Sequence, residues 1–162
     1  MIVLGLDPSP LRLGWAAINL ETGLLLDSGV YDLAPTRRDN RPHEGFRFGL
    51  RYIHEAIGEP GLVGIEKPMS RRNGEAFDNG RVFALAVEHA DTQWPFCEIH
   101  PWVPAAWKKT IGLPGNCGKP LVAEWAVSQL PDPGWAITQD EADALAIAHA
   151  TRQLWANQKE TK

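Results

Sequence analysis

Apolar residues occur along the chain in two patterns, and these patterns predict the order of strands and helices. Short apolar or alternating runs between turn residues are typical of strands, and apolar residues recurring every three or four positions are typical of helices. The predicted strands span residues 2–7, 13–20, 24–32, 61–66 and 95–99, and the predicted helices span 44–57, 75–90, 102–110, 118–130 and 139–156. Three successive strands followed by alternating helices and strands predict an α/β architecture, with a mixed central sheet flanked by helices.

The predicted helix at 75–90 differs from the others because it is apolar most of the way round. Its apolar residues include Val82, Phe83, Leu85, Ala86 and Val87. A helix with apolar residues on several sides is usually buried on more than one side. One sheet covers only one side, so we expect a second surface to cover the other.

Length and composition favour one globular domain. The chain has 162 residues, of which 44% are hydrophobic, and we assign residues 1–157 to the domain and residues 158–162 to a polar C-terminal tail. No apolar run approaches the ~18 residues of a membrane span. The apolar N-terminal run is interrupted by Asp7 and reads as a strand, not a signal peptide. We expect a cytoplasmic protein of a bacterial or phage-infected bacterial cell, without membrane contact.

The charge balance alone argues mildly against a nucleic-acid partner, because phosphate contacts need cations. Lys and Arg number 16 against 20 Asp and Glu. If four carboxylates form a metal site, however, the remaining charges balance, and the position of the cations then matters more than their total. The clustered cations are Arg37, Arg38 and Arg41, then Lys67, Arg71, Arg72 and Arg81, then Lys108, Lys109 and Lys119.

Two acids stand at the ends of apolar strands. Asp7 closes the first strand, and Glu66 closes the fourth. A single acid at a strand end often caps a turn, and that interpretation suffices for either residue alone. A carboxylate at the end of a buried strand nevertheless costs free energy to desolvate unless something pairs with it.

The last predicted helix adds two more acids on one face. Asp140 and Asp143 are three residues apart and share a face with Ala144 and Ile147, which packs on the sheet, whereas Glu141 projects about 100° away. The helix dipole accounts for exposed acids at a helix start but less well for two acids directed toward the core. Clustered carboxylates raise each other's pKa, and a bound cation removes that cost. Oxygen ligands of this kind suit Mg²⁺ or Mn²⁺.

Four segments of the chain resemble the motifs of the RuvC-type Holliday junction resolvases, which belong to the ribonuclease H-like superfamily. The segments are LGLDPSPLRLGWAAI (4–18), IEKP (65–68), KKTIGLPGNCGKPLV (108–122) and DEADALAIA (140–148). The resemblance extends from residue 2 to about residue 150. It implies a ribonuclease H-like fold and a structure-selective, Mg²⁺-dependent crossover junction endodeoxyribonuclease.

The resemblance also assigns site residues. It implies that Asp7, Glu66, Asp140 and Asp143 are the catalytic carboxylates and hold two Mg²⁺ per active site, for which Mn²⁺ can substitute. We expect two-metal-ion hydrolysis of phosphodiester bonds that leaves 5′-phosphate and 3′-hydroxyl ends. The DNA-binding candidates are Lys108 and Lys119, with Lys109 as a neighbouring alternative, and the implied partners are four-way DNA junctions and a second copy of the chain in a homodimer.

The chain departs from the family pattern at two places. Ser9 and Pro10 follow Asp7-Pro8, where the family usually has glycine, and Met69 stands where the family tends to have an aromatic wedge. Methionine can also wedge between bases. We therefore keep Met69 as a DNA-binding candidate, together with Arg71 and Arg72, which the resemblance does not explain.

Other functions compete with this hypothesis. The nearest is a YqgF-like nuclease that processes pre-ribosomal RNA, whose later motifs differ from IEKP and DEADALA. A catalytically inactive module that binds branched DNA is a second alternative, which the four carboxylates disfavour. Most of the seven tryptophans are expected in the core or at an interface, but Trp102 and Trp107 are also candidates for stacking on a base.

Overall fold

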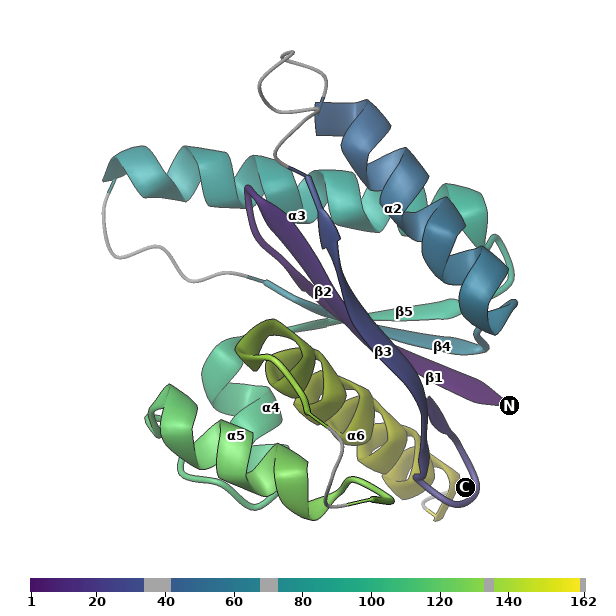
Figure 1. Ribbon diagram of the computed structural model, residues 1–162, viewed down its shortest axis with the longest axis vertical. Helices are drawn as coiled ribbons and strands as arrows, with labels where there is room; N and C mark the ends of the chain where they lie inside the picture. Colours follow the sequence, from purple (N-terminus) through teal and green to yellow (C-terminus); the bar gives the residue numbers. More distant parts are fainter. Residues whose placement is uncertain (34–41, 68–72, 133–135, 161–162) are drawn as a thin grey trace.

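The computed structural model describes residues 1–33, 42–67, 73–132 and 136–160, and these residues form one five-stranded sheet with helices on both faces (Figure 1). The strands are β1 (Ile2–Pro8), β2 (Arg12–Asn19), β3 (Leu25–Asp32), β4 (Leu62–Glu66) and β5 (Glu98–Trp102). Their order across the sheet is β3-β2-β1-β4-β5. The β1–β2 and β2–β3 pairs are antiparallel and the β1–β4 and β4–β5 pairs are parallel, which confirms the predicted mixed sheet.

The helices divide between the two faces of the sheet, as Figure 1 shows. The helices α2 (Pro42–Ile57) and α3 (Asn73–Gln93) cover one face, and α4 (Pro104–Thr110), α5 (Lys119–Ser128) and α6 (Gln139–Glu160) cover the other. Because α6 continues to Glu160, residues 158–160 of the predicted tail are helical. Within the described residues, no helix is both long and apolar enough to cross a membrane.

One predicted strand is displaced by three residues. The strand expected at 95–99 begins instead at Glu98, because the chain first has to turn away from α3. The N–H of Trp94 donates to the carbonyl of Ala90, and the N–H of Cys97 donates to the carbonyl of Trp94. The apolar residues of this segment are therefore partly used in a turn, which periodicity alone does not distinguish from a strand.

Three glycines allow α6 to lie unusually close to the sheet. A Cβ atom at Gly5 would collide with the carbonyl oxygen of Ala144, and one at Gly64 would collide with the Thr151 hydroxyl. At Gly14 a Cβ would lie 2.5 Å from the carbonyl oxygen of Asp140. The three glycines lie on three neighbouring strands, so together they form a shallow trench for the helix.

Candidate active site

The face of the sheet on which Asp7 and Glu66 lie follows from the positions of the glycines on the same strands. Side chains alternate along a strand, so Asp7 lies on the same sheet face as Gly5, and Glu66 lies on the same face as Gly64. Both acids therefore face α6. They follow directly after Leu6 and Ile65, which are paired in the parallel β1–β4 ladder, so the two carboxylates lie side by side at one edge of the sheet.

The start of α6 places the other two acids beside them. Gly14, which contacts the backbone of Asp140, is the cross-strand partner of Asp7. Asp140 therefore sits over the strand next to Asp7, and Asp143 follows one helical turn later on the same helix face. The helix-face prediction thus agrees with the position of α6 in the structure.

Glu141 lies outside this cluster, as predicted, and has a different role. Its carboxylate accepts hydrogen bonds from the N–H and hydroxyl of Thr138, at 2.9 and 2.6 Å, which forms a capping box at the start of α6. It also accepts a 2.9 Å hydrogen bond from the hydroxyl of Ser28 on β3. Glu141 therefore ties the start of α6 to the sheet edge.

The four acids share one electrostatic environment. Burial raises the pKa of Asp7 well above its usual range, and the charges of Glu66, Asp143 and Asp140 raise it further. Burial also raises the pKa values of Glu66 and Asp143, and the charge of Asp143 adds to the effect at Glu66. The ionised cluster is therefore costly without a cation, which fits the predicted metal site.

Each of three acids also has a neutral or cationic neighbour. The indole N–H of Trp107 donates to Glu66 Oε2 at 2.7 Å, and the Gln139 amide donates to Asp143 Oδ1 at 3.0 Å. Arg12 lies 3.6 Å from Asp140 in a partly exposed ion pair. The sequence did not indicate these three partners. Trp107 and Gln139 carry no charge, and Arg12 is far from Asp140 along the chain.

The acids suit a hard divalent cation by donor type, but their side chains have not converged into a ligand cage. Within the described residues, no three His, Cys, Asp or Glu side chains are arranged to hold a metal ion. Each contact of Glu66, Asp143 and Asp140 named above involves one carboxylate oxygen. The donor set therefore fits Mg²⁺ or Mn²⁺, and Asp7, Glu66, Asp140 and Asp143 are the residues that would hold it.

Two lysines border the acidic cluster. The charges of Lys119 and Lys108 both lower the pKa values of Glu66 and Asp143, opposing burial, and Lys119 does the same for Asp7. The Lys108 ammonium donates to the carbonyl of Cys117 at 3.0 Å, which fixes the turn before α5. Lys109 is exposed on α4. Lys108 and Lys119 thus lie close enough to the acids for their charges to act on them.

The remaining candidates for DNA contact either lie outside the described residues or are buried. Met69, Arg71 and Arg72 lie outside the described residues, as do Arg37, Arg38 and Arg41. Trp102 and Trp107 are 6% and 1% exposed, which agrees with the expected core position and contradicts the alternative that either one stacks on a base. Both indoles are instead used in the packing between α4, β5 and α6.

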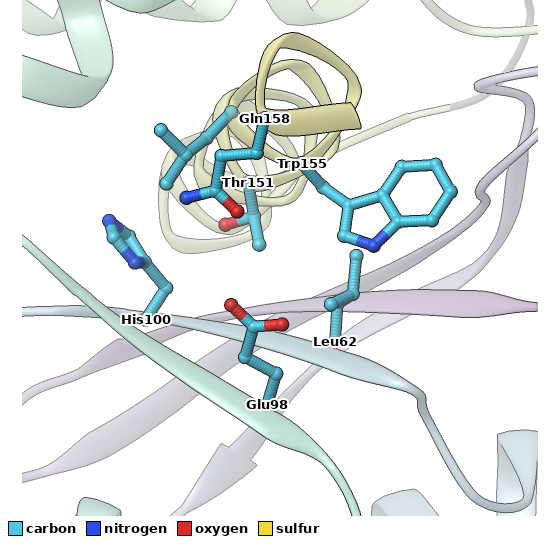
Figure 2. A pocket seen from close by; sticks show the side chains of 7 residues that line it. Leu62, Glu98, His100, Thr151, Trp155 and Gln158 are labelled. Atoms are coloured by element: carbon cyan, nitrogen blue, oxygen red, sulfur yellow. The ribbon is translucent and has the colours of Figure 1, made fainter. Parts of the chain in front are cut away.

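The pocket in Figure 2 lies at the opposite end of the sheet from the acids. Leu62 and Glu98 begin β4 and β5, and their side chains line it together with Thr151 and Trp155 of α6. Its volume of about 10 Å³ holds roughly one water molecule. This pocket is therefore too small for a substrate and is separate from the acidic cluster.

Comparison with known proteins finds curated relatives that share one description. No family model matches the chain. A relative from Rickettsia felis, described as crossover junction endodeoxyribonuclease RuvC, is 27% identical over 158 residues, covering 92% of this chain and 96% of the relative. A relative from Dehalococcoides mccartyi with the same description is 27% identical over 172 residues, covering 97% and 95%.

The solved structures share the fold over nearly the whole chain. The structure of Thermus thermophilus RuvC in complex with a Holliday junction substrate superposes with a TM-score of 0.76 at 21% identity, covering 98% of this chain and 96% of that one. The chain is therefore similar in sequence to the curated RuvC relatives over nearly its whole length, and it shares the fold of the solved RuvC structure.

Proposed function

We propose that this protein is a structure-selective DNA endonuclease that resolves four-way junctions by Mg²⁺-dependent hydrolysis of phosphodiester bonds. The observation that supports the proposal is the buried group of Asp7, Glu66 and Asp143, whose pKa values are raised by burial and whose charges interact, with Asp140 beside them. The relatives' description as crossover junction endodeoxyribonucleases supports the same activity.

The proposed chemistry assigns a role to each part of the site. Two divalent cations, when bound, supply activation of the attacking water and stabilisation of the leaving 3′ oxygen. Asp7 lies between Glu66 on one side and Asp140 on the other, so it is the residue that would take part in holding both cations. Glu66, Asp140 and Asp143 complete the ligand set, and cleavage leaves 5′-phosphate and 3′-hydroxyl ends.

Cleavage of purified protein on matched nucleic acids tests this function. We expect cuts in a synthetic four-way DNA junction when Mg²⁺ is present, none when Mg²⁺ is replaced by a chelator, and much slower cleavage of a linear duplex of the same sequence. A structured RNA is included because the YqgF-like alternative cuts RNA. Preferential cleavage of the RNA, or junction binding without any cleavage, would contradict the proposal.

Lys119 is proposed to contact the phosphate backbone near the scissile bond. It is exposed at the start of α5, and its charge acts on Asp7, Glu66 and Asp143. Each lost phosphate contact lowers the log–log slope of binding against salt by about one unit. We expect Lys119→Ala to weaken junction binding and reduce this slope by about one, as measured by junction affinity in Ca²⁺ at several salt concentrations. An unchanged slope would remove Lys119 from the DNA path.

We also propose that two copies of the chain pair through α3. An apolar groove of about 600 Å³ lies between this helix and the edge strand β5. It is lined by Phe83, Ala84, Val87, Glu88, Asp91, Cys97, Ile99 and Pro101. The same helix contributes Leu85, Ala86 and Ala90 to the core, whereas Phe83 and Val87 of the groove are only partly buried against that core, which leaves apolar surface for a partner to cover. A two-fold dimer would present two cleavage sites to the two-fold symmetric strands of a junction.

Sedimentation of the purified protein tests the pairing. We expect a dimer at micromolar concentration, and Val87→Arg should shift it toward monomer because a charge in the groove opposes its burial. Phe96→Arg is the matched control, because Phe96 is 91% exposed and does not line this groove. A wild-type protein that sediments as a monomer, with or without junction DNA, would contradict the proposed dimer.

A further inference from the structure

Trp107 contacts the acidic cluster through Glu66 and, unlike the acids and lysines around it, carries no charge. It lies on α4, is 1% exposed, and donates its indole N–H to Glu66 Oε2 at 2.7 Å. A hydrogen bond to a carboxylate is stronger than one between neutral groups. It favours the ionised form of Glu66, since it lowers the pKa that burial raises.

The surroundings of Trp107 keep the indole in one orientation. The ring packs in an apolar cluster with Ile111 of α4's C-terminal end, Val122 of α5 and Ile147 of α6. A buried ring in such a cluster has few alternative rotamers. The Lys108 ammonium lies 5.3 Å from the ring centroid, so the same indole also contacts one of the two lysines beside the acids. The N–H therefore points at Glu66 from a rigid base built by three helices.

We propose that Trp107 is a positioning residue that holds the Glu66 carboxylate in the orientation needed to bind the metal. The inference rests on the proposed metal-dependent function. The indole engages Oε2, which leaves Oε1 as the oxygen with which Glu66 would hold the metal. Groups that orient metal ligands in this way typically contribute a factor of about 10–100 to metal affinity or activity.

Trp102 offers a matched comparison for a purely structural effect. It is also buried, belongs to the same apolar cluster and donates its indole N–H in a 2.9 Å hydrogen bond. Its acceptor, however, is the hydroxyl of Thr151, which is two turns further along α6 than Asp143. Replacing either tryptophan with phenylalanine keeps a buried ring and removes one N–H, but only Trp107→Phe removes a contact to a metal ligand.

Metal titration of the protein without DNA separates the two roles. We expect Trp107→Phe to bind Mn²⁺ about tenfold or more weakly in isothermal titration calorimetry, while Trp102→Phe binds with wild-type affinity. The Mg²⁺ concentration for half-maximal cleavage should rise by a similar factor in Trp107→Phe only. Junction affinity measured in Ca²⁺ should stay the same in both variants.

The outcomes distinguish this inference from the proposed function. If the wild-type protein binds no Mn²⁺, the metal-dependent function itself fails. If the wild type binds Mn²⁺ and Trp107→Phe binds equally well, or if both variants weaken equally, the role of Trp107 is overturned while the function stands. If a variant does not fold, indole N–H signals of the wild-type protein give the same test by NMR. Mn²⁺ should broaden the Trp107 signal more than the Trp102 signal, and equal broadening would overturn the inference.

Discussion

Asp7→Asn should make the metal-free protein more stable while cleavage is lost. The substitution removes a carboxylate that is desolvated by burial and repelled by Glu66, Asp143 and Asp140. We expect cleavage to fall by roughly 10²–10³-fold or more, the scale seen when a main source of transition-state stabilisation is removed. The melting temperature without metal should rise, by about 2–4 °C for each kcal/mol gained in a domain of this size.

The pH dependence of this stability gain follows from the raised pKa of Asp7. A folded-state pKa above the unfolded value means that the contribution of Asp7 to the stability of the metal-free protein is fully present below the unfolded pKa, and is lost as the pH rises through the folded pKa. Asparagine does not titrate, so the advantage of Asp7→Asn should be largest at neutral and alkaline pH. It should disappear near pH 4, about the pKa of an unperturbed aspartate. Thermal unfolding at a series of pH values in chelator measures the difference.

Metal and a neighbouring acid provide the controls for Asp7→Asn. Saturating Mg²⁺ should stabilise the wild type, by about 2.7 kcal/mol at 100 times the Kd, and should leave Asp7→Asn unchanged. Glu141→Gln should cleave normally and gain no stability, because glutamine can still complete the capping box with Thr138. An Asp7→Asn protein that is less stable than the wild type in chelator would show that the acids do not repel one another.

The sequence predicted the acidic site because each acid stands at the end of a clearly patterned element. The apolar run before Asp7, the one before Glu66 and the helical spacing of Asp140 and Asp143 fix the sheet edge and the helix face. The assignment of Glu141 to another direction followed from the same helical spacing. The spacing of apolar residues is a local property of a strand or a helix. It therefore predicts to which face of that strand or helix a side chain belongs.

Contacts between distant elements were not predictable in the same way. Trp107 and Glu66 are 41 residues apart, and no local pattern tells which acceptor a buried indole will meet. The boundary of β5 was missed because Trp94 and Cys97 are apolar residues in a turn. The close approach of α6 depends on Gly5, Gly14 and Gly64, and the absence of their side chains matters only once the helix is placed against them.

Gly14→Ala should therefore damage the site without changing any acid. Its new Cβ would lie 2.5 Å from the carbonyl oxygen and 3.0 Å from the Cβ of Asp140, and a backbone atom cannot turn away as a flexible side chain can. The start of α6 must shift, which separates Asp140 from Asp7. Overpacking of this kind typically costs about 1–3 kcal/mol of unfolding free energy. We expect slower junction cleavage and weaker Mn²⁺ binding at temperatures where the variant remains fully folded.

Gly80→Ala is the matched control for this last prediction. Gly80 lies within α3 with an exposed backbone, and a Cβ there meets no atom within 4 Å. Alanine is favoured over glycine in a helix by up to about 1 kcal/mol, so this variant should be as stable as the wild type or more stable, and should cleave normally. Thermal unfolding, Mn²⁺ affinity and cleavage rate are compared for the two variants and the wild type. If Gly14→Ala equals Gly80→Ala in thermal stability, Mn²⁺ affinity and cleavage rate, the sheet accommodates a methyl group where the backbone of α6 lies closest. The position of α6 would then not depend on the three glycines.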